Sequence, residues 1–257
     1  MIAAALHQFR YDLRAFTRNR QARFFTLILP VLFLVIFAAL FGGNHTTAVA
    51  GGRISTSVYY VPGIIALGVI GAAFVNLVAS VTAQRERGVL KRRRATPVPA
   101  VAVIAGRVLT SVVVALVMAG VLLAIGWAAY GAVVPGRTAL ALGVTVVVGA
   151  ASFCCLGFGL ASLVRNEDAA QPVTQAILLP LYFISGVFVA VSVLPRWLAR
   201  VGEVFPVRHF ADALLVAYNP HTAGLGFAGL DLLIVAGWGI AGLLVALARF
   251  SWLPLGR

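Results

Sequence analysis

The most densely charged part of the sequence lies at residues 84–97. It reads Gln-Arg-Glu-Arg-Gly-Val-Leu-Lys-Arg-Arg-Arg-Ala-Thr-Pro, with a glycine after its first charges and a Thr-Pro step at its end. Because Gly and Pro mark turns, we expect a short charged helix on a loop here. Such a helix is suited to docking a soluble partner. A loop whose cations only orient a membrane protein has the same composition, and the residues alone leave both interpretations open.

The other residue types that carry chemistry are not placed for catalysis. A Walker A loop needs a Gly-Lys step, because its lysine reaches the nucleotide phosphates, and the single lysine, Lys91, follows a leucine. The four histidines are scattered and the two cysteines, Cys154 and Cys155, are adjacent within an apolar run, so we predict no metal site. Glu167-Asp168 is an isolated acidic pair in a loop. We therefore predict no enzyme activity and no cofactor on this chain.

The composition places these residues in a membrane protein. Of the 257 residues, 61% are hydrophobic and 11% are charged, against about 25% charged in soluble domains, and the mean hydropathy is +1.02. A chain this apolar needs the bilayer as its solvent. The net charge of +13 could suggest nucleic acid, but the basic residues lie between apolar runs. We therefore predict no nucleic-acid binding and attribute these residues to membrane lipid and to orientation in the bilayer.

Six apolar runs are long enough to cross a hydrocarbon core about 30 Å thick. They lie near residues 24–41, 58–82, 108–130, 139–164, 172–194 and 230–252. We predict an all-α membrane protein with six transmembrane helices in a single domain over residues 24–257. Pro180, Ser185-Gly186 and Pro195 interrupt the fifth run, which predicts a broken or re-entrant hairpin between helices 5 and 6. A plain kinked helix with a surface loop is the alternative.

Residues 1–23 precede these runs and are predicted to form an amphipathic helix. Apolar residues recur at spacings of four and three from Ile2 to Phe16, and Arg10, Arg14 and Arg18 follow one another at i+4 on another face. A basic amphipathic helix is suited to lie in the headgroup plane, so we expect an interfacial helix. A helix that merely leads into the first span is the alternative.

The distribution of basic residues orients the predicted spans. With the N-terminus in the cytoplasm, fifteen of the 20 Lys and Arg residues fall on the cytoplasmic side. The five on the outside are Arg53, Arg137, Arg196, Arg200 and Arg208. Because positive residues favour cytoplasmic loops, both termini are predicted to be cytoplasmic.

A few side chains within the spans are candidates to contact a transported compound. They are Phe33, Phe37, Phe74, Asn76 and Gln175. Aromatic residues at span ends are more often interfacial anchors, and the two amides are more often interhelical contacts than ligand sites. Three glycines between residues 237 and 242 favour close helix packing, either within the chain or against a second subunit.

Two segments of the sequence resemble a known family. The first is Glu86-Arg87-Gly88-x-Leu90-Lys91-Arg92, followed by Thr96-Pro97 and Gly106-Arg107. The second runs from Pro180 through Ser185-Gly186-Val187-Phe188 and Leu194-Pro195-x-Trp197-Leu198 to Ala211-x-Ala213-Leu214. Both resemble ABC-2 type transporter permeases, the membrane subunits of ABC exporters that include daunorubicin-resistance-type drug exporters. Arg93 and the pair Arg208-His209 depart from the residues usual in the family.

The resemblance implies a fold and a set of partners. The fold is that of a type V ABC exporter, in which a cytoplasmic coupling helix after helix 2 docks a separate ATPase subunit that binds ATP and Mg. The residues implied for this contact are Gln84, Arg85, Glu86, Arg87, Gly88 and Leu90. A second permease copy or a sister permease would complete the transporter in the bacterial inner membrane.

The function expected from the resemblance is export of a hydrophobic or amphipathic compound, such as a drug, a lipid or a natural product, and hence drug efflux and antibiotic resistance. Two alternatives from other classes are kept. One is a non-transporting membrane anchor or sensory subunit for a cytoplasmic ATPase. The other is a channel.

Overall fold

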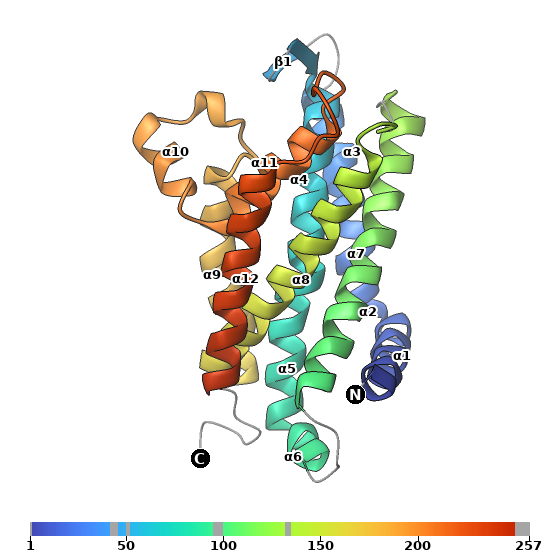
Figure 1. The fold of residues 1–257 in the computed structure, drawn as a ribbon, viewed down its shortest axis with the longest axis vertical. Helices are drawn as coiled ribbons and strands as arrows, with labels where there is room; N and C mark the ends of the chain where they lie inside the picture. Colours follow the sequence, from blue (N-terminus) through green and yellow to red (C-terminus); the bar gives the residue numbers. More distant parts are fainter. Residues whose placement is uncertain (1, 42–45, 50–51, 95–99, 132–134, 250–257) are drawn as a thin grey trace.

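The computed structural model describes residues 2–41, 46–49, 52–94, 100–131 and 135–249, which form a bundle of helices (Figure 1). Among these residues, four helices are long and apolar enough to cross a membrane: Tyr59–Glu86, Val101–Tyr130, Ala139–Leu163 and Gly229–Arg249. The prediction of a helical membrane protein is thus confirmed for these four spans. A shorter apolar helix covers Thr26–Phe37.

The N-terminal part of the chain is helical up to its first apolar segment. Helix α1 (Ile2–Arg18) is followed by α2 (Arg20–Arg23), the π-helical turn η1 (Phe24–Ile28) and α3 (Leu29–Phe41). Strands β1 (Thr46–Val49) and β2 (Gly52–Ser55) then form an antiparallel hairpin that pairs Thr46 with Ser55. The sequence analysis missed this hairpin, whose strands have only four residues each.

The second and third spans are longer than the apolar runs indicate. Helix α4 (Thr56–Ile70), the π-helical turn η2 (Gly71–Val75) and α5 (Asn76–Glu86) follow one another, so the helix continues past the predicted end at residue 82. A short helix, α6 (Val89–Arg94), comes before α7 (Ala100–Tyr130), which begins eight residues before the predicted position 108. The Thr96-Pro97 step lies outside the described residues.

The C-terminal half consists of two long helices and the shorter elements between them. Helix α8 (Ala139–Leu163) is followed by α9 (Glu167–Ile184), the 3-10 turn η3 (Val191–Val193), α10 (Arg196–Gly202), α11 (Pro206–Tyr218) and α12 (Gly229–Arg249). The predicted fifth run reached residue 194, but α9 ends ten residues earlier, where Gly186 adopts a φ of +82°. Only glycine adopts this conformation readily, and the chain leaves the helix there.

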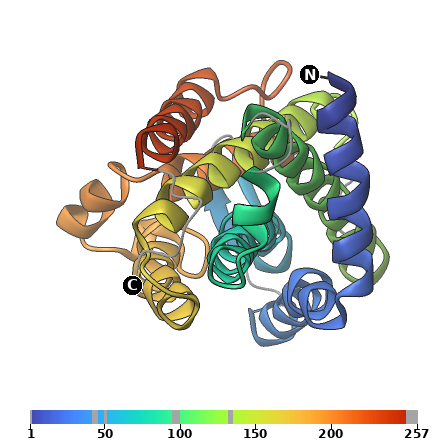
Figure 2. The ribbon, with the colours of Figure 1, turned by 90° about the horizontal axis from the view of Figure 1, so that it is seen from below.

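The helices define two ends of the bundle, as Figure 1 shows. We call the end that carries α1 and α6 the α6 end, and the opposite end, which carries β1 and α10, the β1 end. In the view from below, α1 is seen along its length while α5 is seen nearly end-on (Figure 2). Helix α1 therefore lies across the bundle axis at the α6 end, the orientation expected of an interfacial helix.

Helix α8 occupies the middle of the bundle and contacts α4, α5, α7, α11 and α12. Its contact with α12 depends on small residues. A Cβ atom added to Gly159 would lie 2.8 Å from the carbonyl oxygen of Gly242, and one added to Gly239 would lie 2.7 Å from the Cα atom of Ser152. Gly239 and Gly242 therefore serve close packing within the chain, one of the two roles that the sequence left open.

Candidate functional site

The charged motif predicted to dock a partner lies at the corner between α5 and α6. The backbone N–H of Arg87 donates to the carbonyl of Ala83 and that of Gly88 donates to Arg85, which close the last turn of α5. Gly88 then adopts a φ of +68°, the left-handed conformation that commonly ends helices. The N–H of Arg92 donates to the carbonyl of Gly88, so α6 begins at once on the other side of this turn.

Arg85 points into the bundle instead of toward a partner. Only 1% of its surface is exposed. Its Nη1 donates to the carbonyl oxygen of Ala161 at 2.9 Å, and its Nη2 donates to those of Val164 and, at 3.0 Å, Arg165. The last carbonyls of a helix have no partner within that helix, so the Arg85 guanidinium caps the C-terminus of α8. The Arg85 side chain therefore faces the interior of the bundle, and the contact with an ATPase that the resemblance implies for it stays a prediction.

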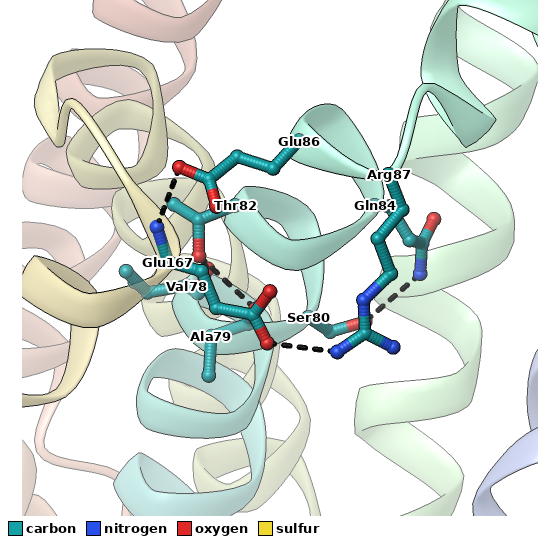
Figure 3. Close-up of polar contacts among 8 residues, drawn as sticks. All are labelled: Val78, Ala79, Ser80, Thr82, Gln84, Glu86, Arg87 and Glu167. Carbon is teal, nitrogen blue, oxygen red and sulfur yellow. Dashed lines mark hydrogen bonds and ion pairs between the residues drawn. The ribbon is translucent and has the colours of Figure 1, made fainter. Parts of the chain in front are cut away.

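The next two residues, Glu86 and Arg87, contact the start of α9. The Glu86 carboxylate accepts a hydrogen bond from the backbone N–H of Glu167 at 2.9 Å, in the first turn of α9. The Arg87 Nη2 forms an ion pair with the Glu167 carboxylate, also at 2.9 Å (Figure 3). The side chain of Arg87 is 70% exposed, so this second contact is open to water and adds little stability.

The remaining residues of the motif divide between the interior and the surface. Leu90 is buried in the core of the bundle, and the Gln84 amide donates to the Ser80 hydroxyl within its own helix at 2.9 Å. Lys91 and Arg92 are exposed on α6. The structure thus presents a short helix that is anchored by Leu90 and exposes Lys91 and Arg92. The predicted contact with an ATPase stays a prediction.

Helix α1 is attached to α7 by a buried polar contact. Asp12 is buried, and its Oδ2 lies 3.3 Å from the Nε of Arg107 and accepts a hydrogen bond from the Gln8 amide at 2.8 Å. A Cβ atom added to Gly106 would lie 2.7 Å from the Gln8 side chain. The sequence analysis missed this role of Asp12, although an acid within a basic helix beside a Gly-Arg step was a usable signal.

The three arginines predicted for the interfacial surface of α1 are exposed. Arg10, Arg14 and Arg18 all face away from α7, as an interfacial helix requires when it is held to the bundle by its other face. The apolar side chains of α1 do not all lie against the bundle, because Leu6 and Tyr11 are exposed as well. Both kinds of residue are available to a lipid surface.

The residues proposed to line a transport path fall into separate environments. Phe33 and Phe37 of α3 lie 5.9 and 5.8 Å, ring centre to ring centre, from Phe188 in the segment after α9. Phe74 is part of the buried core. The Asn76 amide donates to the Thr26 hydroxyl at 2.7 Å, a contact that joins the π-helical turn η1 to the start of α5.

The Gln175 side chain is exposed on α9, and Gln175 is distant in the sequence from the residues that form these contacts. The structure therefore brings Phe33 and Phe37 together and adds Phe188, which the sequence had noted only as part of a motif. Asn76 forms an interhelical contact with Thr26, the role that the sequence analysis favoured for an amide within a span.

The β1 end has a polar cluster of its own on α11. The Arg208 side chain forms an ion pair with Asp212, one turn further along α11. The His209 Nδ1 lies 2.7 Å from the Asp231 carboxylate in α12, and its Nε2 lies 2.8 Å from the carbonyl oxygen of Glu203. Burial raises the pKa of the Asp212 carboxyl, although the Arg208 guanidinium acts in the opposite direction.

Comparison with known proteins finds a match to one family model and relatives that are named as ABC transporter permeases. Residues 7–219 match the model of the ABC-2 type transporter family. The chain is 29% identical over 217 residues, 82% of its length and 73% of the relative, to the daunorubicin resistance ABC transporter permease protein DrrB1 of Streptomyces coeruleorubidus. It is also 29% identical over 156 residues to the probable multidrug ABC transporter permease YbhR of Escherichia coli strain K12. That match covers 60% of the chain and spans 42% of the length of the relative.

Proposed function

The chain belongs to the ABC-2 type transporter family, and we propose from this that it is the membrane-spanning permease subunit of an ATP-driven exporter. The observation that carries the proposal is the short helix α6, which turns away from the second span at Gly88 and exposes Lys91 and Arg92. A helix of this kind, on a family member without a phosphate-binding loop of its own, is suited to receive force from a separate ATPase.

The proposed topology has six spans. To the four long apolar helices we add α3, extended by the π-helical turn η1, and α9. Successive segments of this set run in opposite directions along the bundle (Figure 1). We assign the α6 end to the cytoplasm of the bacterial inner membrane, because positive residues favour cytoplasmic segments. Cytoplasmic termini are part of this proposal, since α1 and the last described turn of α12 lie at that end.

The proposed partner at α6 is a nucleotide-binding subunit that holds ATP and Mg. Lys91 and Arg92 would face an acidic surface around the docking cleft of the ATPase. The exposed Arg87 lies four positions before Lys91 in the sequence. A second copy of this chain, or a sister permease, would form the other half of the transporter. Helix α1, with its exposed arginines, would rest on anionic lipid at the same side of the membrane.

The proposed cargo is a hydrophobic or amphipathic compound. Two relatives carry names of multidrug and daunorubicin-resistance permeases, and the described spans contain few charges that could hold a hydrophilic cargo. The aromatic side chains of Phe33, Phe37 and Phe188 are the proposed contacts, because their rings gather where α3 meets the segment after α9. Export is proposed over import on the strength of the family.

Reconstitution of the chain with an ATPase tests the proposal. Vesicles that contain both proteins should move a fluorescent amphipathic dye only when ATP is supplied. The double substitution Lys91→Glu and Arg92→Glu should abolish binding of the ATPase, whereas Arg14→Glu with Arg18→Glu, the same charge change on α1, should not. Dye flux without the ATPase would instead support a channel. ATPase binding with no more flux than a catalytically inactive ATPase gives would support an anchor or sensory subunit.

A further inference from the structure

We propose that Arg85 and Glu86 act as a clamp that carries movement of α6 to the corner between α8 and α9, and that neither side chain is a contact for the ATPase. This inference rests on the proposed function, because it assigns the path by which a force applied at α6 enters the bundle. It concerns two residues that lie within the motif from which ATPase contacts were expected.

The clamp holds two helix ends of opposite polarity. The Arg85 guanidinium binds three carbonyl oxygens at the C-terminus of α8, and the Glu86 carboxylate binds a backbone N–H at the N-terminus of α9. A helix carries partial negative charge at its C-terminus and partial positive charge at its N-terminus. Each side chain therefore has the charge that its helix end favours. Two consecutive residues thus bind the end of α8 and the start of α9, on either side of the turn between these helices.

The clamp lies next to the turn at Gly88 that joins α5 to α6. Two residues, Arg87 and Gly88, lie between Glu86 and Val89, the first residue of α6, and Gly88 has a φ of +68°. The Leu90 side chain is buried in the core, so α6 does not swing freely about this glycine. A displacement of α6 therefore reaches the last turn of α5 within two residues and passes through the clamp to the α8–α9 turn.

The structure beyond the clamp continues the same path. Helix α8 meets α12 with almost no side chains between the two backbones, at Gly159, Gly239 and Gly242. Helices that pack this closely move together, because small shifts at once bring backbone atoms into contact. On the other side of the turn, α9 leads directly to Phe188 and the aromatic cluster. One movement at the corner thus acts on two spans.

Arginine is suited to the first half of this clamp. Its planar guanidinium presents several N–H donors in a fixed fork, which allows Nη1 and Nη2 to reach carbonyls of three different residues. A lysine ammonium is a single point and cannot span the same three oxygens. The conservative substitution Arg85→Lys therefore keeps the charge but loses the geometry.

Measurements on the complex with ATPase separate the clamp from a docking contact. The variants are Arg85→Lys, Arg85→Gln and Glu86→Lys, with the double variant Lys91→Glu and Arg92→Glu as the docking comparison. The readouts are the affinity of the permease for the ATPase and the amount of dye transported per ATP hydrolysed. We expect the clamp variants to bind the ATPase within about twofold of the unaltered chain but to transport about fivefold less per ATP, or lower. The docking variant should lose affinity.

A distance measurement tests the clamp directly. Spin labels at Val89→Cys, the first residue of α6 and not one of the proposed docking cations, and at the exposed Asp168→Cys would be placed in a chain with Cys154 and Cys155 replaced by Ala. Their separation should stay constant when nucleotide binds the unaltered complex, because α6 and the α9 end move as one unit, and should change in the Arg85→Lys and Glu86→Lys variants. Glu86 is exposed, so its variant is expected to fold even where Arg85→Gln does not.

The outcomes distinguish the clamp from the proposed function. If the Arg85 and Glu86 variants lose ATPase affinity as the docking variant does, the clamp is wrong and the two residues are docking contacts. If transport per ATP is unchanged in all three clamp variants, the clamp is wrong and the proposed function stands. If the unaltered chain binds no ATPase at all, the proposed function fails and the clamp with it.

Discussion

Polar side chains hold the two ends of the bundle in different ways. At the α6 end, the hydrogen bonds of Arg85, Glu86 and Arg87 join residues that are 76 to 81 positions apart in the sequence. At the β1 end, Arg208 pairs with Asp212 four positions away, and His209 reaches positions 6 and 22 away. The hydrogen bonds at the α6 end therefore connect helices that are distant in the sequence. Those at the β1 end connect residues between 203 and 231, within and beside α11.

The attachment of the two ends to the core differs accordingly. Helix α11 is held to α8 by apolar packing, where the Phe210 ring fills the space left by Gly149 and lies 5.5 Å from the Phe153 ring. Apolar contacts are not directional, so α11 is able to shift a little without losing them. Hydrogen bonds to named carbonyls are directional, and the α6 end therefore transmits small displacements with less loss. In the proposed orientation, this difference suits a cytoplasmic end that receives force from the ATPase and an outer end that yields.

Removal of the Arg85 side chain should have the largest effect on stability. Arg85→Met keeps an apolar stem of similar length but leaves three carbonyl oxygens of α8 without their donor. Hydrogen bonds to charged groups contribute about 1.5–3 kcal/mol each, but bonds that share one side chain do not add, so we expect a loss of about 2–4 kcal/mol. Thermal unfolding in detergent would measure it. Arg165→Gln, at an exposed side chain of the same turn, is the control and should change the stability little. An equal loss in both variants would contradict the cap.

Substitution of Asp12 should loosen α1 without unfolding the bundle. Asp12→Asn removes the charge that pairs with Arg107 and keeps the size of the side chain. We expect a loss of about 1–3 kcal/mol, confined to α1, because this helix packs mainly on α7. Faster hydrogen exchange over residues 2–18 would reveal it. Arg10→Gln, an exposed charge on the same helix, should leave that exchange unchanged.

The contact of His209 should be the strongest polar tie at the β1 end. One ring nitrogen lies 2.7 Å from the Asp231 carboxylate and the other lies 2.8 Å from the carbonyl oxygen of Glu203, so this side chain joins α11 both to α12 and to the residue after α10. His209→Gln should lose one bond and about 1 kcal/mol. Trypsin should then cut faster at the exposed Arg196 and Arg200 of α10.

Loss of the Arg87 ion pair should have the smallest effect. The Arg87 side chain is 70% exposed, and exposed pairs contribute about 0–1 kcal/mol. Arg87→Gln should therefore lower the unfolding temperature much less than Arg85→Met does, although the two residues are only two positions apart in the sequence. A similar loss in both variants would show that the α6 end is not organised around the buried cap.

The sequence was sufficient for features that depend on long runs or on one helix face. The fourth apolar run, predicted at 139–164, corresponds to α8 at Ala139–Leu163, and the sixth, at 230–252, corresponds to α12 at Gly229–Arg249. The break in the fifth run was readable from Ser185-Gly186, because glycine permits the left-handed turn found there. The β-hairpin was not readable, since four-residue strands carry too little pattern against an apolar background.

The family of this chain and the cationic motif after its second span were determined by the sequence itself, because residue types and spacing are local properties. The roles of Arg85 and Arg87 were decided only by the tertiary structure. The two residues counted equally among the cations of one loop, yet two positions along a helix rotate a side chain by about 200°. Arg85 therefore faces the end of α8 and Arg87 faces water. Which face is buried depends on a helix about 80 residues further along the chain, and no local pattern specifies how two such distant helices meet.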